Sequence, residues 1–302
     1  RPCYHAREVA LHRAKYFNIP LVLGSATPSI ESYYDAMMKR FKHLRLTGRP
    51  NGQPLPKVQI VDMRKELQER NFSVLSRTLQ QELVRTAAAG EQAIVLLNRR
   101  GYSTFVMCRD CGETIMCPHC AVALVYHEEG KAMRCHYCGN TLPVPEECPK
   151  CHSRRIKFFG TGTQKAETQI AALPEVKVLR MDQDSTLRKF AHEEILNAFS
   201  SGRYNVLIGT QMVAKGHDIP NVTLVGVLSA DSMLNMPDFR AYERAFSLLT
   251  QAAGRAGRGD KPGHVILQVY DADNRTVHLA AAQDYDTFAE EELLRRKELN
   301  YP

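Results

Sequence analysis

Eight of the nine cysteines fall into four C-x-x-C pairs within a stretch of 44 residues. Two thiolates separated by two residues reach the same metal ion, and two such pairs complete the tetrahedral sulfur site that zinc prefers. The alternative is a redox-active enzyme, which would have titratable thiols and no metal. Redox activity is more typical of an isolated C-x-x-C pair than of four pairs in a row. A disulfide framework is disfavoured because the sequence shows no secretory signal. The spacing therefore predicts two Zn²⁺ sites, formed by Cys108, Cys111, Cys117, Cys120, Cys135, Cys138, Cys148 and Cys151.

The stretch between the second and third pairs indicates how the pairs combine. Residues 121–134 alternate in hydrophobicity around a turn at Glu129 and Gly130, which predicts a β-hairpin that brings these two pairs together. The first and fourth pairs then close over the hairpin. The nested grouping is thus Cys108, Cys111, Cys148 and Cys151 for one zinc ion, and Cys117, Cys120, Cys135 and Cys138 for the other. A crossed grouping, first pair with third and second with fourth, stays open because sequence does not determine connectivity.

The charge balance is weakly basic. The chain holds 40 Lys and Arg against 33 Asp and Glu, a formal net charge of +7. Eight thiolates and two Zn²⁺ ions lower this to about +3 and leave the cysteine-rich segment mildly acidic. That segment is therefore better suited to protein contacts, or to acting as a wedge, than to gripping phosphates by charge. No apolar run approaches the ~18 residues of a membrane helix, so we expect a cytoplasmic protein with no membrane partner.

Apolar strands alternate with helices on both sides of the cysteine-rich segment. This alternation is typical of a parallel sheet with helices on both faces, so the expected fold is α/β with an inserted zinc module. Expected strands are 92–97, 156–160, 176–181, 205–209, 222–228 and 264–269, and expected helices are 77–89, 187–200, 240–253, 287–299 and one from Gln164. Residues 1–18 are predicted to be helical. The apolar run 21–23 is predicted to be a buried strand, with a helix from Ser29.

The Pro- and Gly-rich segment 47–57 marks a boundary between two parts of the chain. The expected organisation is the end of a first domain (1–46), a linker (47–57), the first part of a second domain (58–101), the zinc-binding insertion (102–155) and the second part of that domain (156–302). Because the first residue is Arg1 and not Met, we expect a fragment of a longer protein.

Two arginines three residues apart form the sharpest remaining motif, in the run from Gln251 to Arg258. They are predicted to share one face of a helix, and the small residues between them allow close approach to a neighbouring backbone. A guanidinium is always charged and binds phosphate oxygens with two donors, so a pair aimed at one point suits a triphosphate. A basic helix end in solvent is the alternative.

Two loops are candidates for phosphate contacts. A strand ends at Gly209, and the polar residues that follow it, Thr210 and Gln211, lie where open α/β sheets bind ligands. An ordinary surface loop is the alternative there. The run from Gly160 to Thr163 precedes a helix, and its amides suit a DNA phosphate. A dinucleotide fingerprint is disfavoured because Lys165 replaces the third glycine, but a plain capping box formed by Thr161 and Gln164 fits equally well.

Together these segments resemble the superfamily-two helicases. The run 24–27 (GSAT) is similar to the motif that couples the two helicase lobes, and runs 209–220 and 251–258 are similar to the last two helicase motifs. Run 96–101, which leads into four C-x-x-C pairs inside the second lobe, narrows the resemblance to the primosomal replication-restart helicases. The resemblance implies a RecA-like second lobe, preceded by the end of the first lobe, in an ATP-driven 3′→5′ DNA helicase that acts at stalled forks.

The resemblance also implies residue roles, cofactors and partners. Arg255 and Arg258 would contact the γ-phosphate across the cleft between lobes, with Gln251, Gly254, Gly216 and Asp218 on the nucleotide side. Gly24, Ser25, Ala26 and Thr27 would couple the lobes. The DNA path would include Thr210, Gln211, Gly160, Thr161, Gly162, Thr163, Arg99 and Arg100. Implied cofactors are ATP and Mg²⁺ besides two Zn²⁺, and implied partners are DNA, primosome proteins and single-strand-binding protein, for a monomer.

Two departures from the family pattern limit the activity expected of this chain. No G-x-x-x-x-G-K-[ST] run occurs in it, so the loop that cradles the nucleotide phosphates is missing. The acidic Mg²⁺-binding motif is missing as well. We therefore expect the isolated chain not to hydrolyse ATP. The competing hypothesis is a non-catalytic, zinc-dependent module for protein or nucleic-acid interaction on an α/β scaffold.

Overall fold

The computed structural model describes residues 4–46, 54–97, 104–127, 130–159, 163–182, 191–210, 219–236 and 238–301. The chain divides into two compact units, residues 1–43 and 44–302. None of the helices in the described ranges has the length and hydrophobicity needed to cross a bilayer.

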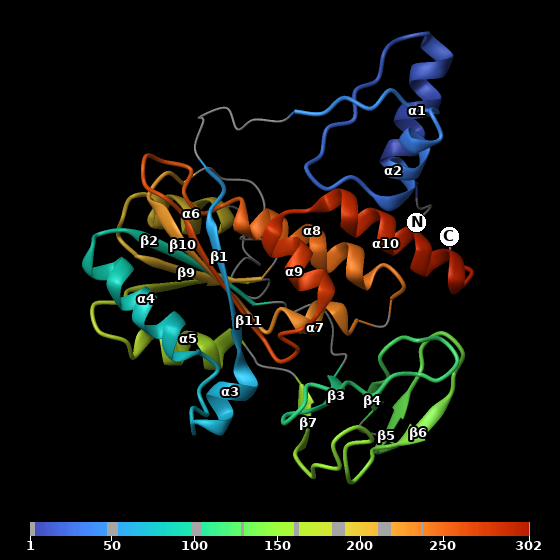
Figure 1. Cartoon of the computed structure of the whole chain (residues 1–302). Helices are drawn as coiled ribbons and strands as arrows, with labels where there is room; N and C mark the ends of the chain where they lie inside the picture. The colour runs from blue at the N-terminus through green and yellow to red at the C-terminus, as the bar shows by residue number, and fades with distance from the viewer. Residues whose placement is uncertain are drawn as a thin grey trace. The chain divides into compact units, whose positions relative to one another are not determined.

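The larger unit is built on a parallel six-stranded sheet in the order β1-β11-β10-β2-β9-β8 (Figure 1). Its strands are β1 (Lys57–Asp62), β2 (Gln92–Leu97), β8 (Val178–Met181), β9 (Val206–Gly209), β10 (Val222–Leu228) and β11 (His264–Val269). Strands β2, β9 and β10 are buried along their whole length. Continuous burial is expected of strands covered on both faces, and it explains their unbroken apolar sequences.

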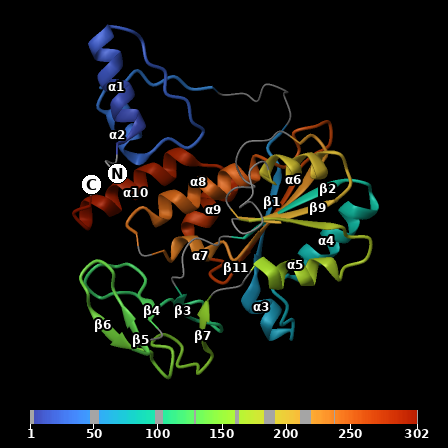
Figure 2. The same cartoon turned by 180° about the vertical axis from the view of Figure 1, so that it is seen from behind.

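Helices cover both faces of this sheet (Figures 1 and 2). Helices α4 (Arg77–Ala88) and α5 (Thr163–Ala171) share one apolar core with alternate residues of the central strands, including Leu79, Ile170 and Val95. Right-handed crossovers place α6 (Ala191–Ser200) and α8 (Ala241–Ala253) on the opposite face. Helices α9 (Arg275–Ala282) and α10 (Tyr285–Glu298) pack beside α8, where the rings of Phe246 and Phe288 stack at 4.2 Å between centroids. The predicted α/β class is confirmed.

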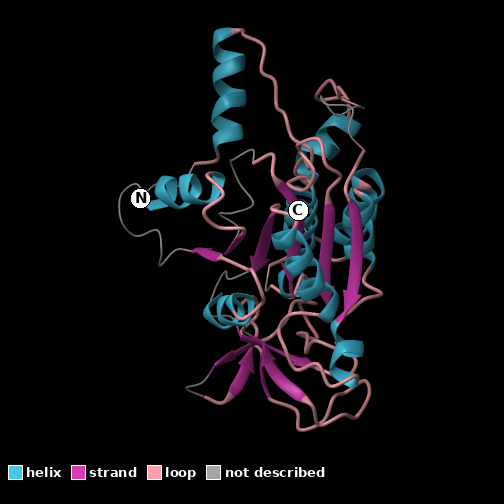
Figure 3. Ribbon diagram, turned by 90° about the vertical axis from the view of Figure 1, so that its left-hand side faces the viewer, coloured by secondary structure: helices cyan, strands magenta, loops and turns pink. Residues whose placement is uncertain are grey.

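The chain between β2 and α5 forms a separate antiparallel sheet, which Figure 3 shows below the parallel sheet. Its order is β6-β5-β4-β3-β7. The strands are β3 (Thr104–Cys108), β4 (Val125–His127), β5 (Ala132–Arg134), β6 (Thr141–Pro143) and β7 (Ile156–Phe159). We call residues 104–159 the cysteine-rich module. The predicted hairpin is present as the antiparallel pair of β4 and β5.

Strand β7 differs from the role that the sequence suggests for it. Residues 156–160 follow the last cysteine and read as the return of the strand and helix alternation, yet β7 pairs antiparallel with β3 and does not join the parallel sheet. The pairing places the entry and exit strands of the module side by side. An insertion whose ends meet in this way leaves the host sheet continuous, since β2 still pairs with β9 and β10.

The smaller unit contains two described helices, α1 (Ala6–Phe17) and α2 (Ile30–Met37). Ser29 caps α2 by accepting a hydrogen bond from the Ser32 backbone N–H at 3.2 Å, as the predicted start of this helix requires. The buried strand predicted at 21–23 is wrong, because residues 4–43 contain no strand and Val22 is 85% exposed. A strand needs a neighbouring strand for its backbone hydrogen bonds, and the helices of this unit do not supply one.

Two short helices had no clear sequence signal. Helix α3 (Met63–Gln68) follows β1 directly, and helix α7 (Asp231–Leu234) follows β10. Both lie just beyond the carboxyl ends of their strands, on the side of the sheet from which β2 leads into the cysteine-rich module. The cysteine-rich module is therefore attached at the carboxyl ends of the parallel strands.

Candidate functional site

The eight paired cysteines form two clusters with the nested grouping. Cluster 1 contains Cys108, Cys111, Cys148 and Cys151, and cluster 2 contains Cys117, Cys120, Cys135 and Cys138, with the sulfurs of each cluster within 4.8 Å of one another. Individual Sγ–Sγ distances are 3.6 Å for Cys108 and Cys151 and 3.7 Å for Cys117 and Cys138. Sulfurs that share a Zn²⁺ ion at ~2.3 Å lie about 3.8 Å apart. Both donor sets therefore fit tetrahedral zinc, and the crossed grouping does not occur.

All four C-x-x-C pairs adopt the same turn. In each turn the N–H of the first cysteine donates to the carbonyl five residues later, and the N–H of the residue four positions later donates back to the carbonyl of that cysteine. The fifth residue of each turn has a left-handed backbone, with φ of 79° at Gly112, 50° at Ala121, 76° at Gly139 and 58° at His152. This turn holds both sulfurs of a pair on one side, ready to meet the second pair. The sequence signal for it was the glycine after two of the pairs.

Backbone N–H groups also point at the cysteine sulfurs. The N–H of Tyr137 donates to Cys135 Sγ, and that of Lys150 donates to Cys148 Sγ, each at 3.4 Å. Burial raises the pKa of both thiols, but the hydrogen bonds from the turns outweigh it. They lower the pKa of Cys135 to about 7 and that of Cys148 below its ordinary value. Because the thiolate is the form that binds metal, these two turns are prepared for a cation.

Cluster 1 rests against the end of β11 and helix α3. The backbone of Gly112 approaches Tyr270 so closely that a Cβ there would lie 2.6 Å from the Tyr270 carbonyl oxygen. Arg64, held by Asp62 through a 2.7 Å ion pair, donates from Nη1 to the Cys111 carbonyl at 3.3 Å. An apolar cluster of Met63, Phe105, Met107, Ala123 and Tyr270 lies between the module and the sheet. The cysteine-rich module is thus docked on the α/β unit through a packed interface.

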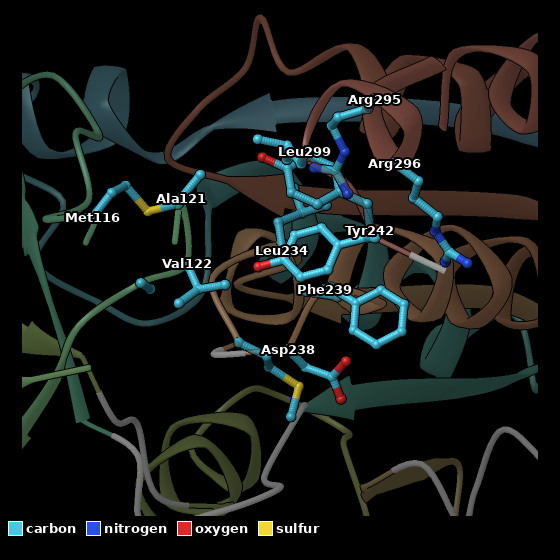
Figure 4. A pocket seen from close by; sticks show the side chains of 14 residues that line it. Met116, Ala121, Val122, Leu234, Asp238, Phe239, Tyr242, Arg295, Arg296 and Leu299 are labelled. Atoms are coloured by element: carbon cyan, nitrogen blue, oxygen red, sulfur yellow. The ribbon is translucent and has the colours of Figure 1, made fainter. Parts of the chain in front are cut away.

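A small hollow that opens to solvent lies beside cluster 2, where Ala121, the residue after Cys120, contributes to its lining. Figure 4 shows Met116 and Val122 of the module on one side and Tyr242 and Phe239 of the α/β unit on the other. The Arg295 guanidinium lies 3.7 Å from the centre of the Tyr242 ring, a cation–π contact. The hollow thus lies between the module and the α/β unit, and aromatic side chains of the α/β unit line one side of it.

The arginine motif lies in a turn, so the predicted placement of both arginines on one helix face is wrong. Helix α8 ends at Ala253 with Gly254 as its cap, and Gly257 has a left-handed φ of 66°. The Gly257 N–H donates to the Val222 carbonyl at 3.0 Å, which turns the chain back toward the sheet. Left-handed backbone ends helical geometry. Arg255 and Arg258 therefore lie on either side of a reversal, both half-buried, and Arg258 Nε donates to the Gly254 carbonyl at 2.9 Å.

The close backbone approach predicted for the small residues of this motif is present. A Cβ on Gly257 would lie 2.3 Å from the Gly263 nitrogen, and a Cβ on Gly263 would lie 2.5 Å from the Ala256 carbonyl carbon. Gln251, in the last turn of α8, donates from Nε2 to Ser247 Oγ at 2.9 Å. The turn that carries the arginines is thus fixed by contact between two glycine backbones.

The other predicted residues divide into described and undescribed positions. Thr210 follows β9 and is half-buried, and Thr163 begins α5. In the smaller unit the run 24–26 is exposed, and the Thr27 N–H donates to Ser25 Oγ at 3.1 Å. Outside the described residues lie Arg99, Arg100, Gly160, Thr161, Gly162, Gln211, Gly216 and Asp218.

A buried carboxyl group that sequence reasoning missed ties two strand ends together. Asp231, the first residue of α7, accepts hydrogen bonds at Oδ2 from the backbone N–H groups of Tyr270, at 2.5 Å, and Asp271, at 2.6 Å. Burial raises the pKa of this carboxyl to about 6. The bonds join the end of β10 to the end of β11, beside the docked module. A single Asp after an apolar strand carries no pattern that would predict this role.

Comparison with known proteins identifies the cysteine-rich module and its host. Residues 117–143 match the PriA DNA helicase Cys-rich region domain, and residues 146–260 match the helicase conserved C-terminal domain. The replication restart protein PriA of Bacillus subtilis is 52% identical over 302 residues, which cover all of this chain and 38% of that protein. PriA of Synechocystis is 46% identical over 310 residues, covering all of this chain and 37% of that protein. The chain belongs to the PriA family.

The matches divide this PriA-family chain unevenly. The Cys-rich region match contains the whole of cluster 2, whereas the helicase match begins between the third and fourth C-x-x-C pairs and ends just after the arginine turn. The chain spans less than half the length of the PriA proteins it matches. Among solved structures, RecG bound to a three-way DNA junction has a TM-score of 0.48 at 15% identity, over 89% of this chain and 26% of that chain. The family assignment comes from the sequence relatives alone.

Proposed function

We propose that this chain is the second motor lobe, with its zinc module, of an ATP-driven 3′→5′ DNA helicase that restarts stalled replication forks and assembles the primosome. The supporting observation is a pair of Cys₄ clusters inserted into a helicase C-terminal domain, in a chain that aligns over its full length with replication restart proteins. The two clusters hold one Zn²⁺ each. The metal supplies folding energy to a module whose small sheet has a limited core of its own.

On the nucleotide side, Arg255 and Arg258 contact the γ-phosphate, with Gln251, Gly254, Gly216 and Asp218 nearby. Guanidinium groups held in a rigid turn stabilise the charge that develops during phosphoryl transfer without reorganising first. The contact between Gly257 and Gly263 supports this role because it fixes the turn between the two arginines. ATP and Mg²⁺ are held mainly by phosphate-binding and acidic motifs that this sequence does not contain, so the 302-residue polypeptide alone does not hydrolyse ATP.

The DNA path follows the carboxyl edge of the parallel sheet. Thr210 lies at this edge after β9. We assign Gln211, Arg99, Arg100 and the run 160–163 to the same path because in the sequence they follow β9, β2 and β7. Gly24, Ser25, Ala26 and Thr27 couple the lobes. The protein acts as a monomer on forked or single-stranded DNA in the cytoplasm. Primosome proteins and single-strand-binding protein are its partners, and they meet the mildly acidic cysteine-rich module.

The test of this function uses a full-length PriA-family protein that carries this chain. Arg255→Ala and Arg258→Ala are expected to lower kcat for DNA-stimulated ATP hydrolysis by about 10³-fold or more, as loss of an arginine finger does, and to leave fork binding unchanged. Arg203→Ala, at an exposed position before β9, is the control. ATP hydrolysis at the unmodified rate in the double variant would overturn the proposed role. Turnover by the isolated 302-residue chain would overturn its predicted inactivity.

A further inference from the structure

The two cysteine clusters share a mode of attachment to the α/β unit. In each case a side chain of that unit donates a hydrogen bond to the backbone carbonyl of the second cysteine of a C-x-x-C pair. Arg64 donates to Cys111 of cluster 1, and Tyr301 Oη donates to Cys120 of cluster 2 at 3.2 Å. We propose that Arg64 and Tyr301 are positioning residues, each of which docks one zinc site separately and depends on the metal in that site.

The anchor of cluster 2 is an aromatic stack. The Tyr301 ring stacks on Phe239 with centroids 5.1 Å apart and planes 13° apart, and it meets the Tyr137 ring edge-on at 6.5 Å. Tyr137 lies between the two cysteines of its own pair, and its hydroxyl accepts the Phe239 backbone N–H at 3.1 Å. Two different C-x-x-C pairs of cluster 2 are therefore tied to the segment before α8, one directly and one through Tyr301.

The anchor of cluster 1 is an ion pair. Arg64 donates from Nε and Nη2 to the Asp62 carboxylate at 2.9 and 2.7 Å, so its guanidinium is held in place before it reaches Cys111. Hydrogen bonds with Asp62 raise the pKa of Arg64, and hydrogen bonds with Arg64 lower that of Asp62 against the effect of burial. The pair is therefore charged throughout the ordinary pH range. Gly112, the next residue after Cys111, packs on Tyr270.

Metal dependence follows from which atom each anchor uses. The carbonyls of Cys111 and Cys120 belong to the turns that present the sulfurs, so their positions are set once four sulfurs hold one ion. Removal of the ion frees the turn and with it the acceptor. Phe239 lies two residues before α8, which ends beside Arg255. The anchor of cluster 2 therefore also fixes the start of the helix that leads to the arginine turn.

The test uses the 302-residue chain after its zinc content has been measured by elemental analysis. Measuring zinc first keeps two negative results apart. A chain that holds no zinc contradicts the proposed cofactor, whereas a zinc-bound chain whose variants behave like the unmodified chain contradicts the proposed anchors. Alkylation by N-ethylmaleimide is then followed for each cysteine by peptide mass spectrometry. Tyr301→Phe removes only the hydroxyl, and its cluster 2 cysteines are expected to react about five-fold faster, the effect of one ordinary hydrogen bond. Cluster 1 cysteines are expected to keep their rates.

Arg64→Gln is expected to give the opposite pattern, with faster alkylation in cluster 1 and unchanged rates in cluster 2. Tyr204→Phe is the matched control and should change neither cluster, because Tyr204 precedes β9 at the amino ends of the parallel strands, away from the module. Tyr301→Leu also removes the stack, and it should raise hydrogen exchange at 238–242 to the level that zinc removal produces in the unmodified chain. The proposal would be overturned if either Tyr301→Phe or Arg64→Gln accelerated alkylation equally in both clusters. It would also be overturned if neither variant accelerated alkylation in any cluster. A general loss of folding appears as the first of these patterns.

Discussion

A Cβ atom on Gly112 would lie 2.6 Å from the carbonyl oxygen of Tyr270. Gly112 is the residue after the second cysteine of the first pair, and Tyr270 directly follows β11. Glycine therefore serves two needs at this position, because the turn requires a left-handed φ of 79° and the docked surface leaves no room for a side chain. Gly139 meets only the first need, since nothing lies within 4 Å of its Cβ direction.

Gly112→Ala and Gly139→Ala are a matched pair that separates docking from turn strain. We expect Gly139→Ala to lower the free energy of unfolding by about 1 kcal/mol, the cost of a left-handed backbone in alanine. Gly112→Ala should lower it by about 2–4 kcal/mol, since overpacking adds to the same strain. Urea unfolding of the zinc-bound chain measures both. Equal losses for the two variants would mean that the contact with Tyr270 does not stabilise the docked module.

The left-handed residues Ala121 and His152 offer the converse change. Each occupies the turn position that Gly112 and Gly139 fill elsewhere, with φ of 50° and 58°. Ala121→Gly and His152→Gly should therefore raise the free energy of unfolding by about 0.5 kcal/mol, the relief of left-handed strain minus the added entropy of the unfolded chain. Ala123→Gly, at a buried position two residues away, should instead destabilise. Thermal unfolding with zinc content held constant checks the sign of each change.

The sequence predicted those features that depend on local spacing. The C-x-x-C pairs and the hairpin between them were enough to predict the nested clusters, and continuous apolar runs located β2, β9, β10 and β11. Features that depend on distant partners were missed. The run 21–23 is apolar like a buried strand, but residues 4–43 contain no strand with which it could pair. Strand β7 pairs with β3 of the module and not with the parallel sheet. The shape of the arginine turn depends on its close contact with Gly263. The role of Asp231 depends on the backbone N–H groups at the end of β11.

The buried Asp231 carboxyl predicts a pH dependence of stability. Burial raises its pKa to about 6 in the folded chain, above the ~3.9 of an unfolded aspartate. The folded state therefore binds the proton more tightly, and the stability from this group is complete below pH ~4 and is lost as pH rises toward ~6. Asp231→Asn removes the ionisation and keeps an acceptor for the Tyr270 N–H.

The measurement for Asp231 is the difference in free energy of unfolding between unmodified chain and Asp231→Asn. Because zinc release at low pH affects both proteins, it cancels in the difference. We expect this difference to shift in favour of the variant as pH rises from ~4 to ~6 and to stay constant above it. A difference that does not vary with pH would show that Asp231 ionises in the folded chain as it does in solvent.

Two glycines of the arginine motif should respond differently to alanine. Gly257 combines a left-handed φ with a Cβ direction that ends 2.3 Å from the Gly263 nitrogen, whereas a Cβ on Gly254 would meet carbonyl oxygens at an ordinary 3.5 Å. Gly257→Ala should lower the free energy of unfolding by about 2–4 kcal/mol, and Gly254→Ala should change it by less than about 0.5 kcal/mol, as a helix cap in right-handed geometry allows.

Gly254 is also a proposed nucleotide-side residue. In a full-length PriA-family protein, Gly254→Ala should therefore raise KM for ATP without loss of stability, and an unchanged KM would remove Gly254 from the nucleotide site.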